Sequence, residues 1–98
     1  MNRDAAVDIL RAHEAPLRRL GVRHAALFGS IARGEGNAGS DLDVMIDVDA
    51  DAVRDVYAYV GLCRFIEELF PVSVDVANRD TLLEHIRVRA ERDAIAAF

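Results

Sequence analysis

The strongest constraint on the fold is the strict alternation of residues 41–48, Asp-Leu-Asp-Val-Met-Ile-Asp-Val. Successive side chains of a β-strand point to opposite faces, so the alternation predicts a strand with two different faces. One face is aliphatic and consists of Leu42, Val44, Ile46 and Val48. The other face has three acidic residues and one methionine: Asp41, Asp43, Met45 and Asp47. We therefore expect the first face to lie against the core and the carboxylates to lie on the opposite side.

Two longer segments carry apolar residues at helical spacing. The first is predicted to begin at an Asn2 cap and to end at Gly21, with a kink at Pro16. The second is predicted to run from about Asp51 to just before Pro71, because a helix seldom continues into a proline. Two helices of this length can cover the aliphatic side of a small sheet.

Shorter segments complete the predicted fold. The runs 23–28 and 72–77 read as strands, and Asp80 could cap a last helix. The order helix, strand, strand, helix, strand, helix predicts an α/β fold, with a short mixed β-sheet and helices packed on one face. With 98 residues in all, we expect a single domain over 1–98.

Charge and composition exclude several classes of function. The formal net charge of −5 disfavours sequence-independent nucleic-acid binding, which depends on an excess of cationic side chains. All 12 basic residues are arginines, so lysine-nucleophile chemistry has no candidate. No apolar run reaches the ~18 residues of a membrane span, and the amino-terminal residues have no signal-peptide core. With Cys63 as the only cysteine, we expect a cytoplasmic protein with no membrane association.

The carboxylates form the first part of a candidate site. Asp75 alternates with valines in the run 72–77, so it lies opposite an apolar strand face like Asp41 and Asp43. If the two strands are neighbours, each like-charge pair costs about 4 kcal/mol at about 4 Å and an effective dielectric constant of 20. A cation would relieve this repulsion, and oxygen ligands favour Mg²⁺ or Mn²⁺ over Zn²⁺. Two such ions could activate an attacking oxygen and hold the phosphates of a nucleotide.

The turn at Gly29-Ser30 forms the second part. Here the chain leaves a predicted strand and enters a short helix, where glycine permits close approach and Ser30 offers a hydroxyl and a free amide. Those are donors for an anionic triphosphate. Arg33 and the loop 34–40, which includes Ser40, follow directly, so we count both residues among the nucleotide-binding candidates. A surface position on the helix explains Arg33 equally well.

The pattern Gly29-Ser30, ten intervening residues, Asp41-Leu42-Asp43 and a later Asp75 resembles the signature of DNA polymerase β-type nucleotidyltransferases. The local run Gly-Ser-Ile-Ala-Arg-Gly at 29–34, with Ser-Asp-Leu-Asp at 40–43, is most similar to the minimal nucleotidyltransferases, the MNT family. The motifs cover residues 23–77, and length and element order extend the resemblance to nearly the whole chain.

The resemblance implies a nucleotidyltransferase fold and a set of site residues. Asp41, Asp43 and Asp75 would bind the metal ions and be catalytic, while Gly29 and Ser30 would bind the nucleotide phosphates. Stand-alone members of this size are typically antitoxins of HEPN-domain ribonuclease toxins. The resemblance therefore implies Mg²⁺-dependent transfer of AMP from ATP to a tyrosine hydroxyl of such a toxin, within a hetero-oligomer of the two proteins.

Two other functions stay open from the sequence alone. The chain could be a nucleotidyltransferase for a small-molecule acceptor, or an antitoxin that acts by stoichiometric binding without catalysis. Polymerase or tRNA-modifying activity is disfavoured by the acidic charge, and we expect no direct nucleic-acid binding.

The remaining polar residues have simpler explanations. Asp47 lies about 13 Å along the strand from Asp43 at ~3.3 Å per residue, so we expect it to be merely exposed. Cys63 falls on an apolar stripe and is expected in the core. The histidines have no metal-ligand spacing and are expected to be structural or exposed: His13, His24 and His85. Three arginines of the last helix form either a solvated face or a contact with partner or nucleotide: Arg87, Arg89 and Arg92.

Overall fold

The computed structural model describes residues 1–37 and 39–98. Its elements in chain order are α1 (Arg3–Ala12), α2 (Glu14–Arg19), β1 (Val22–Phe28), α3 (Gly29–Ala32), β2 (Leu42–Val48), α4 (Val56–Glu68), β3 (Val74–Asn78), the 3₁₀ turn η1 (Arg79–Thr81), α5 (Glu84–Asp93) and β4 (Ile95–Ala96). The predicted α/β fold with a mixed sheet is confirmed. No helix in this part of the chain is long and apolar enough to cross a membrane.

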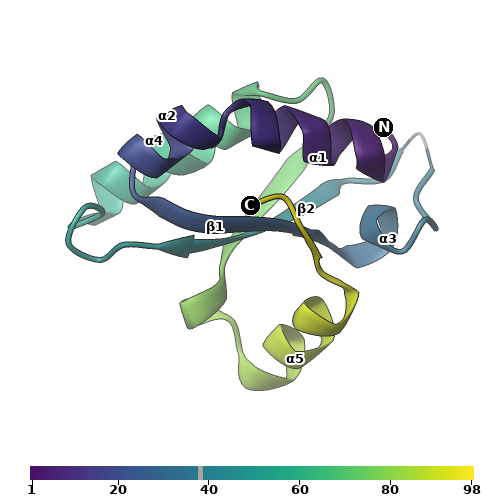
Figure 1. The fold of residues 1–98 in the computed structure, drawn as a ribbon. Helices are drawn as coiled ribbons and strands as arrows, with labels where there is room; N and C mark the ends of the chain where they lie inside the picture. The colour runs from purple at the N-terminus through teal and green to yellow at the C-terminus, as the bar shows by residue number, and fades with distance from the viewer. Residues whose placement is uncertain (38) are drawn as a thin grey trace.

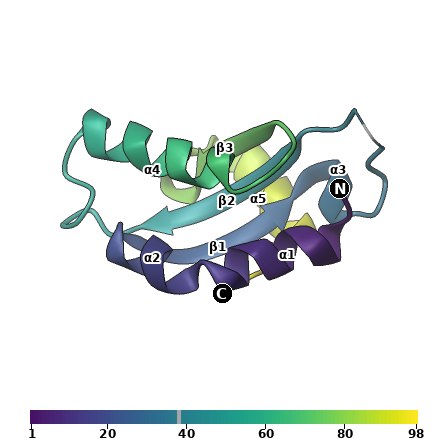
Figure 2. The same cartoon turned by 90° about the horizontal axis from the view of Figure 1, so that it is seen from above.

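The strands form one sheet in the order β3-β2-β1-β4, and Figure 2 shows β1 and β2 side by side in it. β1 is antiparallel to both β2 and β4, whereas β2 and β3 are parallel. Phe28 at the end of β1 pairs with Asp43 near the start of β2, and Asp43 pairs with Asp75 near the start of β3. This register brings three separate parts of the sequence to one end of the sheet.

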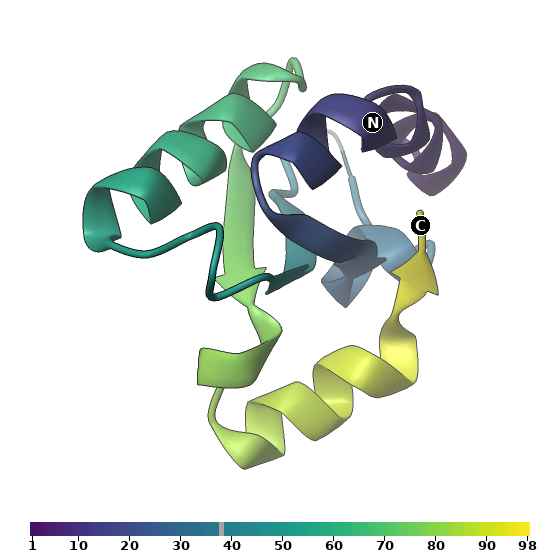
Figure 3. The same cartoon turned by 60° about the vertical axis from the view of Figure 1, so that its left-hand side comes forward.

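Helices lie on both sides of this sheet, so the prediction that they pack on one face only is wrong. α1, α2 and α4 cover one face, and α5 lies on the other (Figures 1 and 3). The main core lies between the sheet and the helices α1, α2 and α4. Leu42 and Val44 of β2 are fully buried in this core. The aliphatic face predicted from the alternation of residues 41–48 is therefore the core face of the sheet.

The acidic face of β2 is also partly covered, which the alternation alone does not predict. Met45 shares this face with Asp43, yet it is buried. α5 lies on this side of the sheet (Figure 3), Met45 lines a small cavity together with Glu91 of α5, and Ala90 of α5 is buried as well. The face of the sheet that carries Asp43 is therefore partly covered by a helix, whereas Asp41 and Asp75 are exposed.

The first predicted helix is two helices, and the break lies at His13 rather than at Pro16. Pro16 has no N–H to donate to the carbonyl of Ala12, and its ring would crowd that carbonyl. The chain solves this by ending α1 at Ala12 and starting α2 at Glu14, so that Pro16 lies in a first turn, where N–H groups have no helical partner. The predicted Asn2 cap is confirmed, since its side chain accepts from the Ala5 N–H at 2.8 Å.

The later helices begin after their predicted starts. α4 begins at Val56 instead of about Asp51, because Asp55 caps it through the Ala58 N–H at 2.8 Å. The residues before it form turns, in which the Val53 N–H donates to the Asp49 carbonyl at 2.9 Å. Local hydrogen bonds thus replace helical ones over a segment whose apolar spacing suits a helix.

Asp80 does not cap the last helix. It lies in η1, where its own N–H donates to the Asn78 side chain at 3.2 Å. α5 begins only at Glu84, after Leu83, and has no side-chain cap. An Asn side chain that binds the backbone two residues onward favours a turn over a helix start, which explains the later onset.

The carboxyl-terminal residues pack within the chain. β4 pairs with β1, and buried Ala97 donates its N–H to the Ala25 carbonyl at 2.8 Å. Arg11 of α1 donates to the Ala97 carbonyl at 2.9 Å, and the Arg18 guanidinium stacks 4.9 Å from the centre of the Phe98 ring. The apolar carboxyl-terminal residues therefore pack against other parts of the same chain.

Candidate nucleotide and metal site

The Gly29 turn is a position that only glycine fits. Its φ is +76°, in the left-handed region, and it joins the end of β1 to α3. A Cβ added here would collide with Asp43 Oδ2 and lie 3.0 Å from Asp43 Cγ. The backbone of the turn thus rests directly on the Asp43 carboxylate, and the two predicted parts of the site are adjacent.

The three predicted carboxylates meet at the same place. Asp43 and Asp75 are paired across the parallel strands β2 and β3, and Asp41 lies two residues before Asp43. Asp43 is half-buried, while Asp41 and Asp75 are exposed. The two strands are therefore neighbours, which is the condition under which the sequence predicts repulsion among these carboxylates.

The pKa of Asp43 is raised by burial and by the neighbouring carboxylates. Burial is the largest cause that raises its pKa above the ordinary value of 3.8, followed by the negative charges of Asp75 and Asp41. The Arg33 guanidinium acts in the opposite direction and lowers it. Burial and like charges both disfavour the carboxylate form, whereas a nearby cation favours it.

The donor set suits a hard divalent cation. Carboxylate oxygens are ligands that Mg²⁺ and Mn²⁺ prefer. As placed, residues 1–37 and 39–98 contain no group of three His, Cys, Asp or Glu side chains close enough to enclose an ion. Asp41 and Asp75 are exposed, so their side chains can adopt other rotamers.

Arg33 lies beside the turn and already has two partners. Its Nε is 2.8 Å from Glu35 Oε2, and its Nη1 is 2.9 Å from Asp93 Oδ2 at the end of α5. These bonds raise the Arg33 pKa, with the contribution of Glu35 the larger. The Gly29 carbonyl accepts from the Arg33 N–H at 3.1 Å, so this arginine is anchored at backbone and side chain.

The loop after α3 leads to the carboxylates. Ser40 lies directly before Asp41, and its Oγ accepts from the Asn37 N–H at 2.9 Å. The Ser30 carbonyl accepts from the Glu35 N–H at 2.9 Å, which closes the turn after α3. The loop predicted over 34–40 includes position 38, which lies outside the described residues.

A small cavity lies between this turn and α5. Its volume is about 190 Å³, and its walls are Phe28, Gly29, Arg33, Ile86, Arg89, Ala90 and Asp93. Asp93 could not be found from sequence because only the fold brings it beside Arg33, 60 positions away. Of the three α5 arginines considered from the sequence, the cavity includes Arg89.

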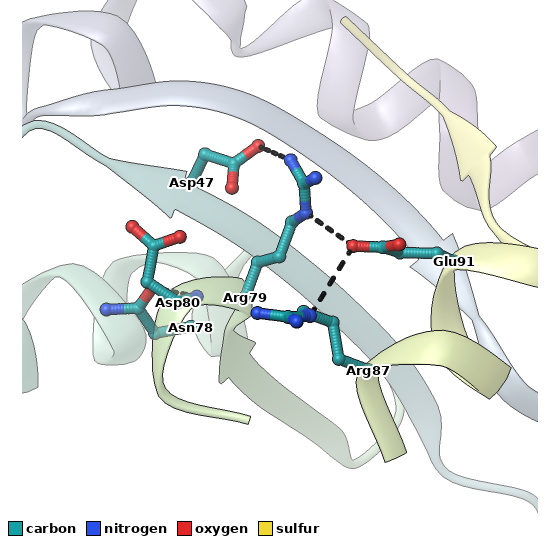
Figure 4. A network of polar contacts seen from close by, with 6 residues as sticks. All are labelled: Asp47, Asn78, Arg79, Asp80, Arg87 and Glu91. Atoms are coloured by element: carbon teal, nitrogen blue, oxygen red, sulfur yellow. Dashed lines mark hydrogen bonds and ion pairs between the residues drawn. The ribbon is translucent and has the colours of Figure 1, made fainter. Parts of the chain in front are cut away.

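Asp47 is not simply exposed, as the sequence suggested. It is held in the network of Figure 4, where its Oδ2 is 3.4 Å from Arg79 Nη1 and its side chain is 20% exposed. Arg79 Nε also lies 2.8 Å from Glu91 Oε1, and Arg87 Nε is 3.9 Å from the same atom. The ion pair with Arg79, which also binds Glu91 of α5, explains why Asp47 is not fully exposed. None of the residues of this network lines the cavity beside Gly29.

The histidines and the cysteine fall outside the site. His24 and His85 are exposed, and His13 Nδ1 lies 2.8 Å from the Ile9 carbonyl oxygen. Cys63 is half-buried rather than fully in the core, and burial raises the pKa of its thiol. A raised thiol pKa keeps it protonated and unreactive at neutral pH.

The comparison with known proteins decides the family. A model of the nucleotidyltransferase domain matches residues 10–97. The chain belongs to the nucleotidyltransferase family. This nucleotidyltransferase is similar to the protein adenylyltransferase MntA of Thermococcus cleftensis, with 32% identity over 88 residues that cover 89% of the chain and 87% of the relative. A candidate protein adenylyltransferase of Methanocaldococcus jannaschii is 31% identical over 90 residues, or 90% of each protein.

Solved structures agree with this assignment. A structure described as a candidate minimal nucleotidyltransferase superposes with a TM-score of 0.71 at 29% identity, over 97% of this chain and 95% of the other. A toxin–antitoxin structure with AMP-PNP gives a TM-score of 0.69 at 17% identity, over 90% and 72%, which is a likeness of fold. The chain is a nucleotidyltransferase enzyme of the minimal type, as its motifs indicated.

Proposed function

We propose that this nucleotidyltransferase is an antitoxin that transfers AMP from ATP to a tyrosine hydroxyl of a cognate HEPN ribonuclease toxin. The similarity to a protein adenylyltransferase over most of both chains supports a protein acceptor. The fold likeness to chains of toxin–antitoxin structures supports the biological setting. The tyrosine and the HEPN partner come from the resemblance of the motifs to stand-alone MNT proteins.

One observation carries the proposal. The Gly29 backbone rests on Asp43, and Asp43 is paired in register with Asp75. A phosphate chain bound at the Gly29-Ser30 turn would therefore lie beside a cluster of carboxylates. Transfer of a nucleotidyl group needs mainly positioning and charge neutralisation, which this adjacency can supply.

Each part of the site has its own role. The backbone of Gly29 and the amide and hydroxyl of Ser30 would hold the phosphates. Asp41, Asp43 and Asp75 would hold two Mg²⁺ ions, or Mn²⁺, which when bound neutralise phosphate charge and activate the attacking oxygen. Arg33 would add a positive charge at the same turn.

The bonds exchanged are those of an adenylyl transfer. The tyrosine oxygen forms a bond to the α-phosphorus of ATP, and the bond between the α-phosphorus and the α–β bridging oxygen breaks. Pyrophosphate leaves with the electron pair, and the phenolic proton is released. Because Asp41 and Asp75 are exposed at the edge of the domain, a tyrosine that projects from a partner protein can reach this position.

The test is the intact mass of the co-purified partner after incubation with this protein, ATP and Mg²⁺. We expect a gain in whole AMP units that Asp43→Asn cannot produce. Asp47→Asn is the matched control, because Asp47 lies on the same strand and face but in a separate ion-pair network. It should retain transfer.

Other outcomes point to the other functions. Neutralisation of the partner by Asp43→Asn at wild-type strength, with no mass gain from any nucleotide, would favour stoichiometric binding. Efficient transfer to a small acceptor by the isolated chain would favour a small-molecule enzyme.

A further inference from the structure

We infer that Arg89 of α5 binds the phosphates of the nucleotide, so that α5 forms the second wall of a site that the motifs place only at the Gly29-Ser30 turn. This inference rests on the proposed nucleotide site and adds a residue to it. It also assigns different roles to three arginines that lie close together in the sequence.

The cavity of about 190 Å³ supplies the geometry. Phe28 and Gly29 line it from the sheet side, and Ile86, Arg89 and Ala90 line it from α5. The same Gly29 also contacts Asp43, at the position where a Cβ would sit. A phosphate held at the Gly29 backbone would therefore lie near both the Asp43 carboxylate and the cavity that Arg89 lines.

The size of the cavity indicates which part of a nucleotide it takes. Sites for whole ligands of drug size measure about 300–1,000 Å³. A cavity of about 190 Å³ is too small for an entire nucleoside triphosphate. Most of its lining is apolar, and its charged side chains are Arg33, Arg89 and Asp93, of which Asp93 is paired with Arg33. The guanidinium groups are the donors that phosphate oxygens prefer.

Arg89 is the more available of these two arginines. Arg33 is already bonded to Glu35 at 2.8 Å and to Asp93 at 2.9 Å. Within the described part of the chain, Arg89 belongs to no ion pair, and its side chain is exposed. A phosphate can therefore bind Arg89 without displacing a carboxylate.

The rotation of α5 selects Arg89 over its neighbours. The α5 residues that line the cavity share one helix face at spacings of three, four and seven: Ile86, Arg89, Ala90 and Asp93. Arg87 points into the network with Glu91, at 3.9 Å, and Arg92 is exposed and absent from the cavity wall. The three arginines carry the same charge, but only Arg89 lies on the helix face that lines the cavity.

α5 is also held in place for this role. Its end is bonded to α3 through Arg33 and Asp93, and Ala90 is buried against the sheet side. Arg89 directly precedes Ala90 and lies four residues before Asp93. Its backbone position relative to Gly29 is thus set before a nucleotide binds, which reduces the ordering needed on binding.

The experiment is calorimetric titration of the full chain with ATP, in the presence of Mg²⁺ and without acceptor. We expect Arg89→Gln to weaken ATP binding about tenfold, the effect of one lost hydrogen bond to a charged group. Arg92→Gln is the matched control, with the same change on the same helix, and should stay within about twofold of the wild type. Arg89→Lys should recover part of the loss because it restores the charge.

A comparison of ATP with AMP binding shows whether Arg89 contacts the phosphate chain. Arg89→Gln should weaken ATP binding more than AMP binding, since the contact is to the phosphate chain. Equal losses in Arg89→Gln and Arg92→Gln, or equal losses for ATP and AMP, would overturn the role of Arg89. A wild-type chain that binds no nucleotide at all would instead overturn the proposed function itself.

Discussion

The two ends of the β2–β3 strand pair differ in the chemical groups that surround their cavities, and this difference identifies the candidate nucleotide site. At the far end, where both strands finish, lies a cavity of about 550 Å³ lined by Val48, Val53, Val56, Tyr59 and Asn78 among others. At the near end, where both strands start, the cavity beside Gly29 is only about 190 Å³. Both cavities are lined mainly by apolar groups, but the smaller one includes a constrained glycine that contacts the Asp43 carboxylate. Cavity volume alone therefore does not identify the end suited to phosphate chemistry.

The electrostatics of the two ends differ in the same sense. Burial is the largest cause that raises the pKa of Tyr59, to about 12, at the far end, and it is also the largest cause at Asp43. The next contribution at Tyr59 comes from the neighbouring Cys63 thiol. At Asp43 it comes from two further carboxylates, Asp75 and Asp41. An accumulation of like charge that a cation would relieve is found at the near end.

The largest effect we predict separates the two ends of β3. Asp75→Asn removes a carboxylate of the near end and should lower the transfer rate about 100-fold, which corresponds to about 3 kcal/mol of transition-state stabilisation. Asp80→Asn, just beyond the far end of β3, should leave the rate within about twofold. Single-turnover transfer from labelled ATP measures both. Equal rates for the two variants would remove the distinction between the ends.

The next effect concerns the contact between the turn and Asp43. Gly29→Ala should destabilise the protein by about 1–3 kcal/mol, because φ is +76° and the new Cβ would strike Asp43. Gly34→Ala is the matched control, since its φ is +77° but a Cβ there meets no atom of the described residues within 4 Å. Urea unfolding of both variants isolates the collision from the backbone strain. If Gly34→Ala is as destabilising as Gly29→Ala, the contact with Asp43 contributes nothing.

A smaller effect follows from the raised pKa of Asp43. Its pKa is higher in the folded state than the ordinary 3.8, so the ionised carboxylate opposes folding above the folded-state pKa. Protonation removes this penalty as the pH falls through that range. In metal-free buffer, Asp43→Asn should therefore be more stable than the wild type at neutral pH, and the difference should shrink on acidification. Thermal melts at stepped pH measure it, and a difference that grows on acidification would contradict burial and like charge as the causes of the raised pKa.

The smallest effect belongs to the far end. Val56 is 71% exposed and lines the large cavity, so Val56→Ser should change neither ATP affinity nor stability by more than about 0.5 kcal/mol. The same calorimetric titration with ATP checks the affinity. A several-fold loss of ATP binding in Val56→Ser would place the nucleotide at the far end instead.

Local pattern predicted much of the near end. Alternation in residues 41–48 identified both faces of β2, and the Gly29-Ser30 turn followed from its place between a strand and a short helix. These features depend on neighbours in the sequence, so they can be read without the fold. Helix boundaries were less predictable, because Pro16 ends α1 already at Ala12 and a single capping hydrogen bond at Asp55 decides where α4 starts.

Distant packing produced what the sequence could not indicate. The Arg33–Asp93 ion pair joins residues 60 positions apart, and it exists because α5 returns to the acidic face of the sheet. The same return buries Met45 and selects Arg89 for the cavity. Periodicity assigns residues to faces of an element, but it does not say which other element will cover them.

The most direct test of the metal and nucleotide site is a titration of ¹⁵N-labelled protein with substoichiometric Mn²⁺, followed by NMR line broadening. We predict that the amides of Gly29, Ser30, Asp43 and Asp75 broaden first, and that Asp43→Asn suppresses this broadening. Amides near Val48 and Tyr59, at the end about 17 Å along the strand at ~3.3 Å per residue, should broaden last. Broadening that begins at the far end, or that is unchanged in Asp43→Asn, would contradict the central claim that the start of β2 and β3 is the metal and nucleotide site.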